Sequence, residues 1–452
     1  MKVRLSGRSW RTTGAGLLGA SLAACLIAAC APAERSGGFA PDAPALFAGS
    51  TRRRVRVGPL AQSPIKHVVI IVQENRSFDN LFQGYPGADT QAYGYNTSGQ
   101  KIRLRPISLA AKYGLDHSSP QFFADYDGGK MDGFDSEPAG GPHPAHPAYG
   151  YVPHGESQLY FAMAQQYALA DRMFTSHIDA SFVSHQYIIA GQAQHSVDLP
   201  SIQWGCGGNS SQVATLNNDR SYGPDQSPCF DYPTLGDELD QVGLTWRFYA
   251  AGLTDLWSGY QAVSHIYNGP EWANVIAPNT QFLQDVGNGT LANVTWITPT
   301  CPTSDHAGCG SKQGPQWVAS LVDAVGQSPF WNSTAIFIMW DEWGGWYDHV
   351  PPPYVDYDGL GIRVPLLMIS PYAKAGYVSH VQYEHGSILR FVEDQFGLPQ
   401  LSASDKRAND PGVDPAAFDF SQKPRPYNAV PTLYSPLFFK SLPYDGRPPD
   451  DD

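Results

Sequence analysis

Three short, uninterrupted apolar runs constrain the fold of this chain more than any other feature of its sequence. They are HVVIIV at 67–72, AIFIMW at 335–340 and VPLLMIS at 364–370. A run that is apolar on both faces of a strand is typical of a parallel sheet that helices cover on each side. We therefore expect these three runs to be central strands of one such sheet.

Helical patterns lie between the runs. Apolar residues recur at helical spacing in 157–174, 315–327 and 386–398. Alternating strands and helices favour an α/β fold with a doubly wound, mostly parallel central sheet and helices on both faces. The chain has 452 residues, of which 42% are hydrophobic, so it can bury one large core. Its 45 glycines and 38 prolines indicate long, shaped loops, which we expect as cap insertions.

Two of the apolar runs end abruptly in polar side chains. ENRSFD follows the first run at 74–79, and DEWGGWYDHVPPP follows the second at 341–353. Ligands of doubly wound sheets bind beyond the carboxyl ends of the strands. Acidic groups gathered there repel one another, and a divalent cation with oxygen ligands relieves the repulsion. Four side chains are expected to converge at this edge: Glu74, Asn75, Asp341 and Glu342.

A simpler alternative is that the two acids after the second run only cap a helix or pair with an arginine. One strand end of this kind would favour that alternative. Two such ends, with Gly344 and Gly345 allowing tight turns, favour a site.

The N-terminal segment has the pattern of an export signal. MKVRLSGRSWR is basic, and GAGLLGASLAACLIAAC is apolar and rich in small residues. Cys25 and Cys30 each end a bacterial lipoprotein-type cleavage sequence, and the alternative is an ordinary signal cut near Ala31 or Ala33. We expect an exported protein, periplasmic, secreted or held at the outer membrane by an N-terminal lipid. We therefore predict three parts of the chain: a signal peptide at 1–30, a flexible tether at 31–62 and a single domain at 63–452.

Four further cysteines lie in the exported part. They can pair in three ways, and the pairing that closes the shortest loops is Cys206–Cys229 with Cys301–Cys309. A zinc site is the alternative, but there is no CxxC pair, and export favours disulfides. The segment 195–235 is rich in Gly, Ser, Asn and Asp, and we expect it to be a disulfide-pinned excursion near the entrance of the site.

Charge and missing motifs exclude several function classes. The formal net charge is −13, which argues against a nucleic-acid partner. The chain lacks the GxSxG element of α/β-hydrolases, the HExxH element of zinc proteases and the P-loop of nucleotide hydrolases. It also lacks the C-x-P-x-R element of sulfatases.

The polar blocks resemble the signature of a known family. ENRSFD, DEWGGWYDHVPPP and GIRVPLLMISP are similar to blocks of the phosphoesterase family, which contains bacterial non-specific phospholipases C, their plant relatives and acid phosphatases. DHS at 116–118, DGGKMDGF at 127–134 and NGTLANVTWITP at 288–299 extend the resemblance, which runs from about residue 64 to about residue 400. The resemblance implies an alkaline-phosphatase-like fold.

The resemblance also implies a set of metal ligands and a nucleophile. One divalent metal ion, whether Ca, Mg, Mn or Zn, would be held by Glu74, Asn75, Ser181, Asp341 and Glu342. Ser181 takes the nucleophile's place in the family element T/S-x-P-N-R. Val183, Ser184 and His185 replace Pro-Asn-Arg, which leaves Ser184 as a competing nucleophile.

Other polar residues match supporting positions of the family. His117 and His306 match histidines that contact the phosphoryl group or protonate the leaving oxygen. Asn75 would also contact the phosphoryl group. Asp348 and His349 are expected to brace the loop that carries the acids, and Arg363 to tie the motif loops together by bidentate bonds.

The substrate remains open between two classes. Bacterial phospholipases C of the family often carry further C-terminal β domains, whereas this chain ends soon after the last motif, so we expect an acid-phosphatase-like phosphomonoesterase. Aromatic residues near the motifs would instead suit the choline head group of a phospholipase C substrate: Phe182, Trp343, Trp346 and Tyr347. A non-catalytic, surface-anchored binding protein on the same scaffold is the third alternative.

Overall fold

A computed structural model describes residues 63–442, apart from 202, 209, 255–256 and 414–416. The signal peptide predicted at 1–30, with Cys25 and Cys30, and the tether predicted at 31–62 lie outside the described residues. Among the described residues, no helix is both long enough and apolar enough to span a membrane.

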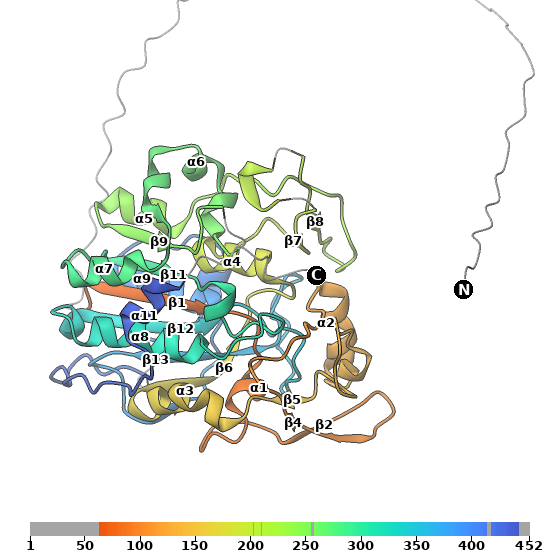
Figure 1. Cartoon of the computed structure of the whole chain (residues 1–452). Coiled ribbons are helices and arrows are strands. Elements are labelled where there is room, and N and C mark those ends of the chain that lie inside the picture. The colour runs from red at the N-terminus through yellow and green to blue at the C-terminus, as the bar shows by residue number, and fades with distance from the viewer. Residues whose placement is uncertain (1–62, 202, 209, 255–256, 414–416, 443–452) are drawn as a thin grey trace, which may run out of the picture. The chain divides into compact units, whose positions relative to one another are not determined.

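A central sheet of eight strands organises the domain, in the order β10-β9-β11-β1-β12-β13-β6-β14 (Figure 1). Seven strands run in one direction, and only β13 is antiparallel to its neighbours. The strands are β1 (His67–Gln73), β6 (Ala168–Phe174), β9 (Trp246–Tyr249), β10 (Val275–Ile276), β11 (Val294–Ile297), β12 (Thr334–Trp340), β13 (Arg363–Ile369) and β14 (Tyr377–Ser379).

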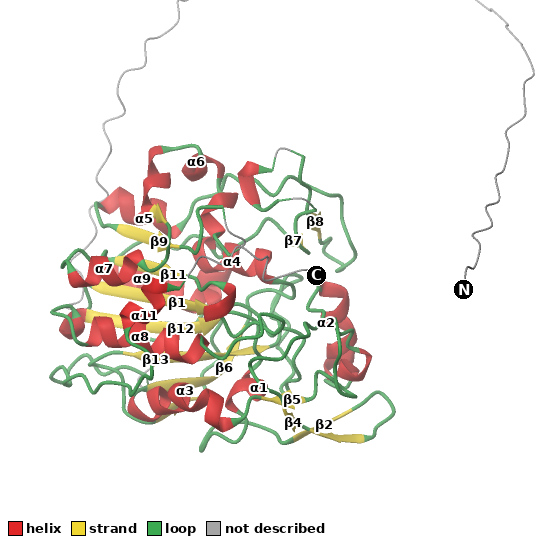
Figure 2. Ribbon diagram, in the orientation of Figure 1, coloured by secondary structure: helices red, strands yellow, loops and turns green. Residues whose placement is uncertain are grey.

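Helices cover both faces of this sheet (Figure 2). α3, α7 and α8 lie in connections that step across the sheet in one direction, and α4 and α5 lie in the return from β6 to β9. Because such crossovers are right-handed, the two groups lie on opposite faces, and the sheet is doubly wound as predicted. The helices are α1 (Phe78–Phe82), α2 (Ser119–Tyr126), α3 (His154–Gln166), α4 (Ser181–Ala190), α5 (Leu235–Val242), α6 (Ser264–Tyr267), α7 (Gln281–Gly287), α8 (Gly314–Gly326), α9 (His385–Phe396), α10 (Ala403–Arg407) and α11 (Pro436–Ser441).

The predicted strands are confirmed as β1, β12 and β13, but the third does not run in the predicted direction. No helix lies between β12 and β13, so the chain turns back at the same edge of the sheet and β13 pairs antiparallel with β12. An apolar run does not encode strand direction. The consequence is that Arg363, the first residue of β13, starts at the edge where β1 and β12 end.

The predicted helices at 315–327 and 386–398 are confirmed as α8 and α9, whereas the pattern at 157–174 is a helix only in its first half. α3 ends at Gln166, and Ala168–Phe174 forms β6 between β13 and β14. Sheet pairing on both sides overrides the helical spacing of this second half.

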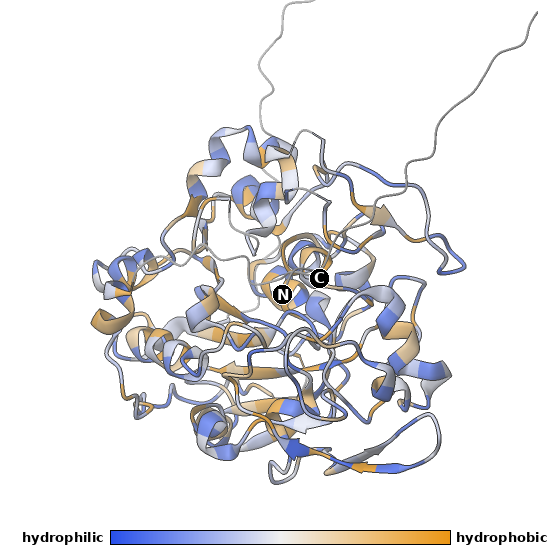
Figure 3. Cartoon of the chain, turned by 45° about the vertical axis from the view of Figure 1, so that its right-hand side comes forward, coloured by the Kyte–Doolittle hydropathy of each residue, from blue (hydrophilic) through white to orange (hydrophobic). Residues whose placement is uncertain are grey.

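The core lies along the sheet. All residues of β12 and β13 are buried, as are all residues of β1 except His67. Figure 3 shows hydrophobic stretches concentrated in these strands. Burial on both faces explains why their sequences do not alternate between apolar and polar residues.

Both predicted disulfides are present, Cys206–Cys229 and Cys301–Cys309, so the alternative of a zinc site at these cysteines is wrong. The first lies in the predicted excursion at 195–235, which also holds the small sheet of β7 (Ser196–Val197) and β8 (Ala214–Thr215). Four further short strands form two small sheets outside the core: β2 (Tyr93–Tyr95) with β3 (Lys101–Arg103), and β4 (Arg105–Pro106) with β5 (Gly150–Tyr151).

A buried acidic cluster away from the motif edge makes stability depend on pH. Burial and the neighbouring Asp405 raise the pKa of Glu393 from 4.5 to about 10, and burial with Asp405 raises the pKa of Glu238 to about 8. In the folded chain these two carboxyl groups therefore stay protonated at pH values at which they are ionised in the unfolded chain. This stabilisation is fully present below pH 4.5 and is lost as the pH rises toward 10.

We predict that Glu393→Gln removes much of this pH dependence. Each retained proton makes the free energy of unfolding fall by about 1.4 kcal/mol per pH unit. The variant should therefore match the unsubstituted protein near pH 5 and be more stable than it at pH 8. Urea unfolding at both pH values measures the difference, and equal pH slopes for the two proteins would contradict the prediction.

Candidate active site

The motif edge brings the ends of β1 and β12 side by side. Gln73 and Trp340, the last residues of the two strands, are paired in register, so Glu74 and Asp341 leave the sheet together. The backbone N–H of Asn75 donates to Asp341 Oδ1 at 2.9 Å. Three of the four side chains predicted to converge are thus in one place.

The backbone at Asn75 adopts a conformation that most residues avoid. Its φ is 61°, in the left-handed region. Gly344 lies against it, because a Cβ on that glycine would sit 2.4 Å from the carbonyl oxygen of Asn75. The close approach of the two motif loops therefore requires glycine at 344.

Helix α4 adds two more side chains to this edge. Ser181 is its first residue, and His185 lies one turn later on the same face. His185 Nε2 lies 3.3 Å from Glu74 Oε1 and 3.9 Å from Asp341 Oδ2. Glu74, His185 and Asp341 are all buried, and their ligand atoms lie within 4.8 Å of one another. Sequence analysis did not predict His185 as a ligand, although its i+4 spacing from Ser181 is a usable signal.

The electrostatics of this group fit a bound cation. Burial and the neighbouring Glu74 carboxylate raise the pKa of Asp341 well above its usual range, so two negative charges here are unfavourable without a counter-ion. Asn75 Oδ1 is buried without a hydrogen-bond partner among the described residues, and the buried Ser181 hydroxyl lies against the Asp341 carboxyl. Divalent cations bind buried carboxylate, amide and hydroxyl oxygens of this kind.

Glu342 lies beside His117 at the same edge of the sheet. Its Oε2 accepts a hydrogen bond from the backbone N–H of Gly344 at 2.6 Å, and its Oε1 lies 3.8 Å from His117 Nε2. It is not part of the group formed by Glu74, His185 and Asp341. Asn75 Nδ2 lies 3.2 Å from the same nitrogen of His117, so the Asn75 and Glu342 side chains both reach this histidine.

Both predicted histidines lie at this edge. His117 Nδ1 donates to the carbonyl oxygen of Leu115 at 2.8 Å, which leaves Nε2 to accept from Asn75 Nδ2 at 3.2 Å. The rings of His117 and His306 are 6.1 Å apart. The bond to the carbonyl oxygen of Leu115 requires a proton on Nδ1 and directs Nε2 toward Asn75.

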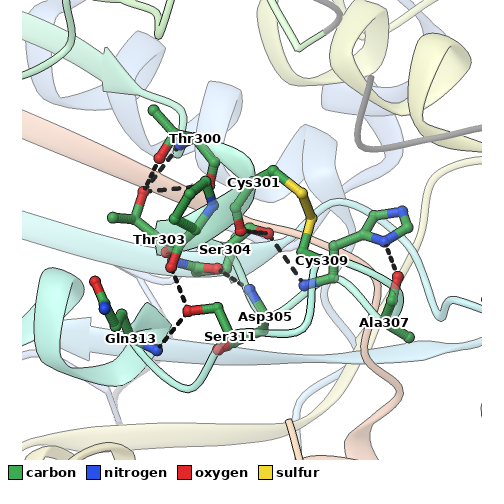
Figure 4. Close-up of a disulfide and its surroundings, with 12 residues drawn as sticks. Thr300, Cys301, Thr303, Ser304, Asp305, Ala307, Cys309, Ser311 and Gln313 are labelled. Carbon is green, nitrogen blue, oxygen red and sulfur yellow. Dashed lines mark hydrogen bonds between the residues drawn. A yellow bond between two sulfur atoms is a disulfide. The ribbon is translucent and has the colours of Figure 1, made fainter. Parts of the chain in front are cut away.

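A disulfide fastens the loop that carries His306. Cys301 and Cys309 close this loop (Figure 4). Within it, the buried Asp305 carboxyl accepts hydrogen bonds from Tyr160 and Trp340, and burial raises its pKa to about 6. Arg76 Nε donates to the carbonyl oxygen of Asp305 at 2.7 Å. The loop is therefore tied both to itself and to the segment after β1.

The two serines of α4 differ in their surroundings. Ser184 Oγ donates to the carbonyl oxygen of Asp341 at 2.6 Å, so its hydroxyl is engaged with the backbone. Ser181 Oγ is buried and makes no such bond.

An ion-pair cluster braces the end of the second motif. Arg363 makes the expected bidentate bond to Asp348, with Nε to Oδ1 at 2.9 Å and Nη2 to Oδ2 at 3.2 Å. Asp79 Oδ2 accepts from both the backbone N–H and Nδ1 of His349, at 2.9 and 2.6 Å. The cluster links β13 to the loop after β12 and to α1.

The predicted aromatic residues pack inside the protein. Trp346 lies beneath the Arg76 guanidinium, and Tyr347 stacks on Tyr149. Trp204 of the excursion at 195–235 lies against Phe182 and His185, with ring centroids 5.3 and 6.2 Å apart. The excursion therefore covers α4 at the site. The predicted aromatic rings contact other side chains inside the protein.

Known proteins share this sequence pattern. Residues 65–399 match the Phosphoesterase family. The chain is 26% identical to Hemolytic phospholipase C of Pseudomonas aeruginosa, over 83% of this chain and 59% of that protein. It is 22% identical to Phospholipase C B of Mycobacterium tuberculosis, over 82% of each. The chain thus spans less than two thirds of the length of the Pseudomonas relative.

A solved structure of a protein in the alkaline phosphatase superfamily from Vibrio parahaemolyticus is also similar. It is 11% identical, with a TM-score of 0.36 over 75% of this chain and 69% of that one. This likeness is distant and does not bear on the details of the site.

We predict that Arg363→Ala destabilises the fold strongly. Removing one partner of a buried ion pair leaves the other charge uncompensated, which costs about 3–5 kcal/mol. Urea unfolding measures the loss. The matched control is Arg390→Ala, which breaks the partly exposed pair with Asp394 and should cost less than about 1 kcal/mol. Equal losses for the two variants would contradict the prediction.

Proposed function

The chain belongs to the phosphoesterase family, and we propose that it is an exported phosphoric-ester hydrolase in which Ser181 is the nucleophile. The observation that carries this proposal is the position of Ser181 Oγ. It is buried at the start of α4 against the Asp341 carboxyl, one turn from a histidine that faces two carboxylates. Unlike the Ser184 hydroxyl, it is not engaged with a backbone carbonyl, so it can attack a bound ester.

The oxygen atoms of the site would hold one divalent cation: those of Glu74, Asn75, Ser181 and Asp341. When bound, such an ion supplies a lowered pKa for the serine hydroxyl and positive charge opposite the phosphoryl oxygens. Glu342, whose carboxylate lies beside Asn75 at His117, is the further ligand that the family resemblance implies.

The reaction then proceeds by two displacements at phosphorus. The Ser181 hydroxyl gives its proton to water, and its Oγ forms a bond to phosphorus in line with the leaving oxygen, whose bond breaks. Asn75 Nδ2 has two hydrogens. One is donated to His117, and the other can be donated to an equatorial phosphoryl oxygen.

We assign proton transfer to the leaving oxygen to His306. His306 is held by its bond to the carbonyl oxygen of Ala307 and by the closed loop between the two cysteines. It can donate a proton as the leaving alcohol departs. Water then attacks the phosphoserine, phosphate or a phosphomonoester is released, and the serine hydroxyl is restored.

Two substrate classes fit this chemistry. A phosphomonoester is our first assignment, because it needs only the phosphoryl contacts described above. A phospholipid head-group ester is the second, favoured by the relatives named phospholipases C in Pseudomonas aeruginosa and Mycobacterium tuberculosis.

We predict that Ser181→Ala lowers turnover of p-nitrophenyl phosphate or p-nitrophenyl phosphorylcholine by at least about 10³-fold, because it removes the attacking oxygen, and that it leaves the melting temperature of the metal-free protein unchanged. Ser184→Ala should keep turnover and lose about 1 kcal/mol of stability, since it breaks a hydrogen bond to the backbone. The reverse result would make Ser184 the nucleophile. No hydrolysis of either ester by the unsubstituted protein would favour a non-catalytic binding protein.

A matched pair of substrates separates the two classes. We predict faster hydrolysis, as kcat/KM, of p-nitrophenyl phosphate than of p-nitrophenyl phosphorylcholine, and loss of both activities with chelator. A preference for the choline ester, together with release of phosphocholine from phosphatidylcholine vesicles, would instead establish the phospholipase C assignment.

A further inference from the structure

His185 stands where the family element T/S-x-P-N-R has arginine. The two side chains have different chemistry. An arginine is always protonated and has no lone pair to offer, so it can only pair with carboxylates. A neutral imidazole can donate a nitrogen lone pair to a metal ion. The departure from the family element therefore changes what the site can bind.

The imidazole of His185 lies next to the two carboxylates that are proposed to bind the metal ion. His185 Nε2, Glu74 Oε1 and Asp341 Oδ2 converge from α4 and from the ends of β1 and β12. In a tetrahedral zinc site with bonds of about 2.0–2.1 Å, neighbouring ligand atoms lie about 3.3 Å apart. The separation of His185 Nε2 from Glu74 Oε1 is 3.3 Å.

The surroundings of His185 support such a role. The residue is 1% exposed, and the ring of Trp204 packs against it at 6.2 Å. The helical spacing from Ser181 places both side chains on one face of α4, and both reach the Asp341 carboxylate. The buried imidazole nitrogen of His185 and the hydroxyl of Ser181 therefore lie on one face of the helix, at the same site.

We propose that His185 is a ligand of the site's metal ion and that its nitrogen makes the site select Zn²⁺ over Mg²⁺ and Ca²⁺. Mg²⁺ and Ca²⁺ take oxygen ligands, whereas imidazole suits zinc and other later transition ions. This inference rests on the proposed function only because both concern the same site. It narrows the metal identity that the oxygen ligands alone leave open, since all-oxygen ligation points to Ca²⁺, Mg²⁺ or Mn²⁺.

The test measures metal binding rather than activity. Metal-free full-length protein is titrated separately with Zn²⁺, Mg²⁺ and Ca²⁺ by calorimetry, for the unsubstituted protein and for His185→Gln. The unsubstituted protein should bind Zn²⁺ at least about 100-fold more tightly than either other ion. The variant should lose at least about 10-fold in Zn²⁺ affinity and change less than about 3-fold for Mg²⁺ and Ca²⁺.

The matched control is His265→Gln. His265 also lies between two carboxylates, with Asp231 at 2.7 Å and Asp237 at 3.0 Å, but it is on α6, outside the site. Its loss should leave Zn²⁺ affinity unchanged. Equal Zn²⁺ affinity in His185→Gln and the unsubstituted protein, equal loss of all three ions in the variant, or tighter binding of Mg²⁺ or Ca²⁺ than of Zn²⁺ by the unsubstituted protein would overturn the proposal.

A second measurement needs no substitution and decides the question if His185→Gln fails to fold. Pulsed electron paramagnetic resonance of protein loaded with one equivalent of Cu²⁺, displaceable by Zn²⁺, should show the nitrogen modulation of a coordinated imidazole. Its absence would overturn the proposal. Zinc bound through His185 in a protein that hydrolyses no phosphate ester would refute the proposed function and leave this inference standing.

Discussion

The repulsion between Glu74 and Asp341 is the constraint on which the rest of this site depends. The parallel register of β1 and β12 sets the two carboxylates side by side in the interior, where no water screens them. Burial and proximity raise the pKa of Asp341, which is the cost of this arrangement. A bound cation would remove that cost and would add positive charge that attracts a phosphate ester, so metal binding and ester binding would both depend on these two carboxylates.

Several features of the fold hold the two strand ends in this unfavourable position. β13 reverses direction at the same edge and brings Arg363 to Asp348. The loop with His306 is closed by a disulfide, and Gly344 allows the second motif to pass directly over Asn75. These contacts lie on four different segments of the chain, which explains why the polar blocks are long and far apart in the sequence.

The apolar runs predicted β1 and β12, and the rule that strand ends share an edge predicted that Glu74, Asn75 and Asp341 meet. The direction of β13 and the break between α3 and β6 were not predictable in this way, because both depend on pairing with strands elsewhere in the chain. Glu342, adjacent to Asp341, lies beside His117 at the same edge, and its role as a metal ligand stays a prediction. His185 was missed because its spacing from Ser181 has meaning only once α4 is known to begin at that serine.

The most direct test of this account is metal analysis of the exhaustively dialysed protein, combined with its melting temperature before and after chelation. If an ion neutralises the buried carboxylates, the protein should retain close to one equivalent of metal. Chelation should then lower the melting temperature, since binding to the folded state alone stabilises it by mass action. Far less than one equivalent of metal, with a melting temperature that chelator and added metal both leave unchanged, would contradict the account.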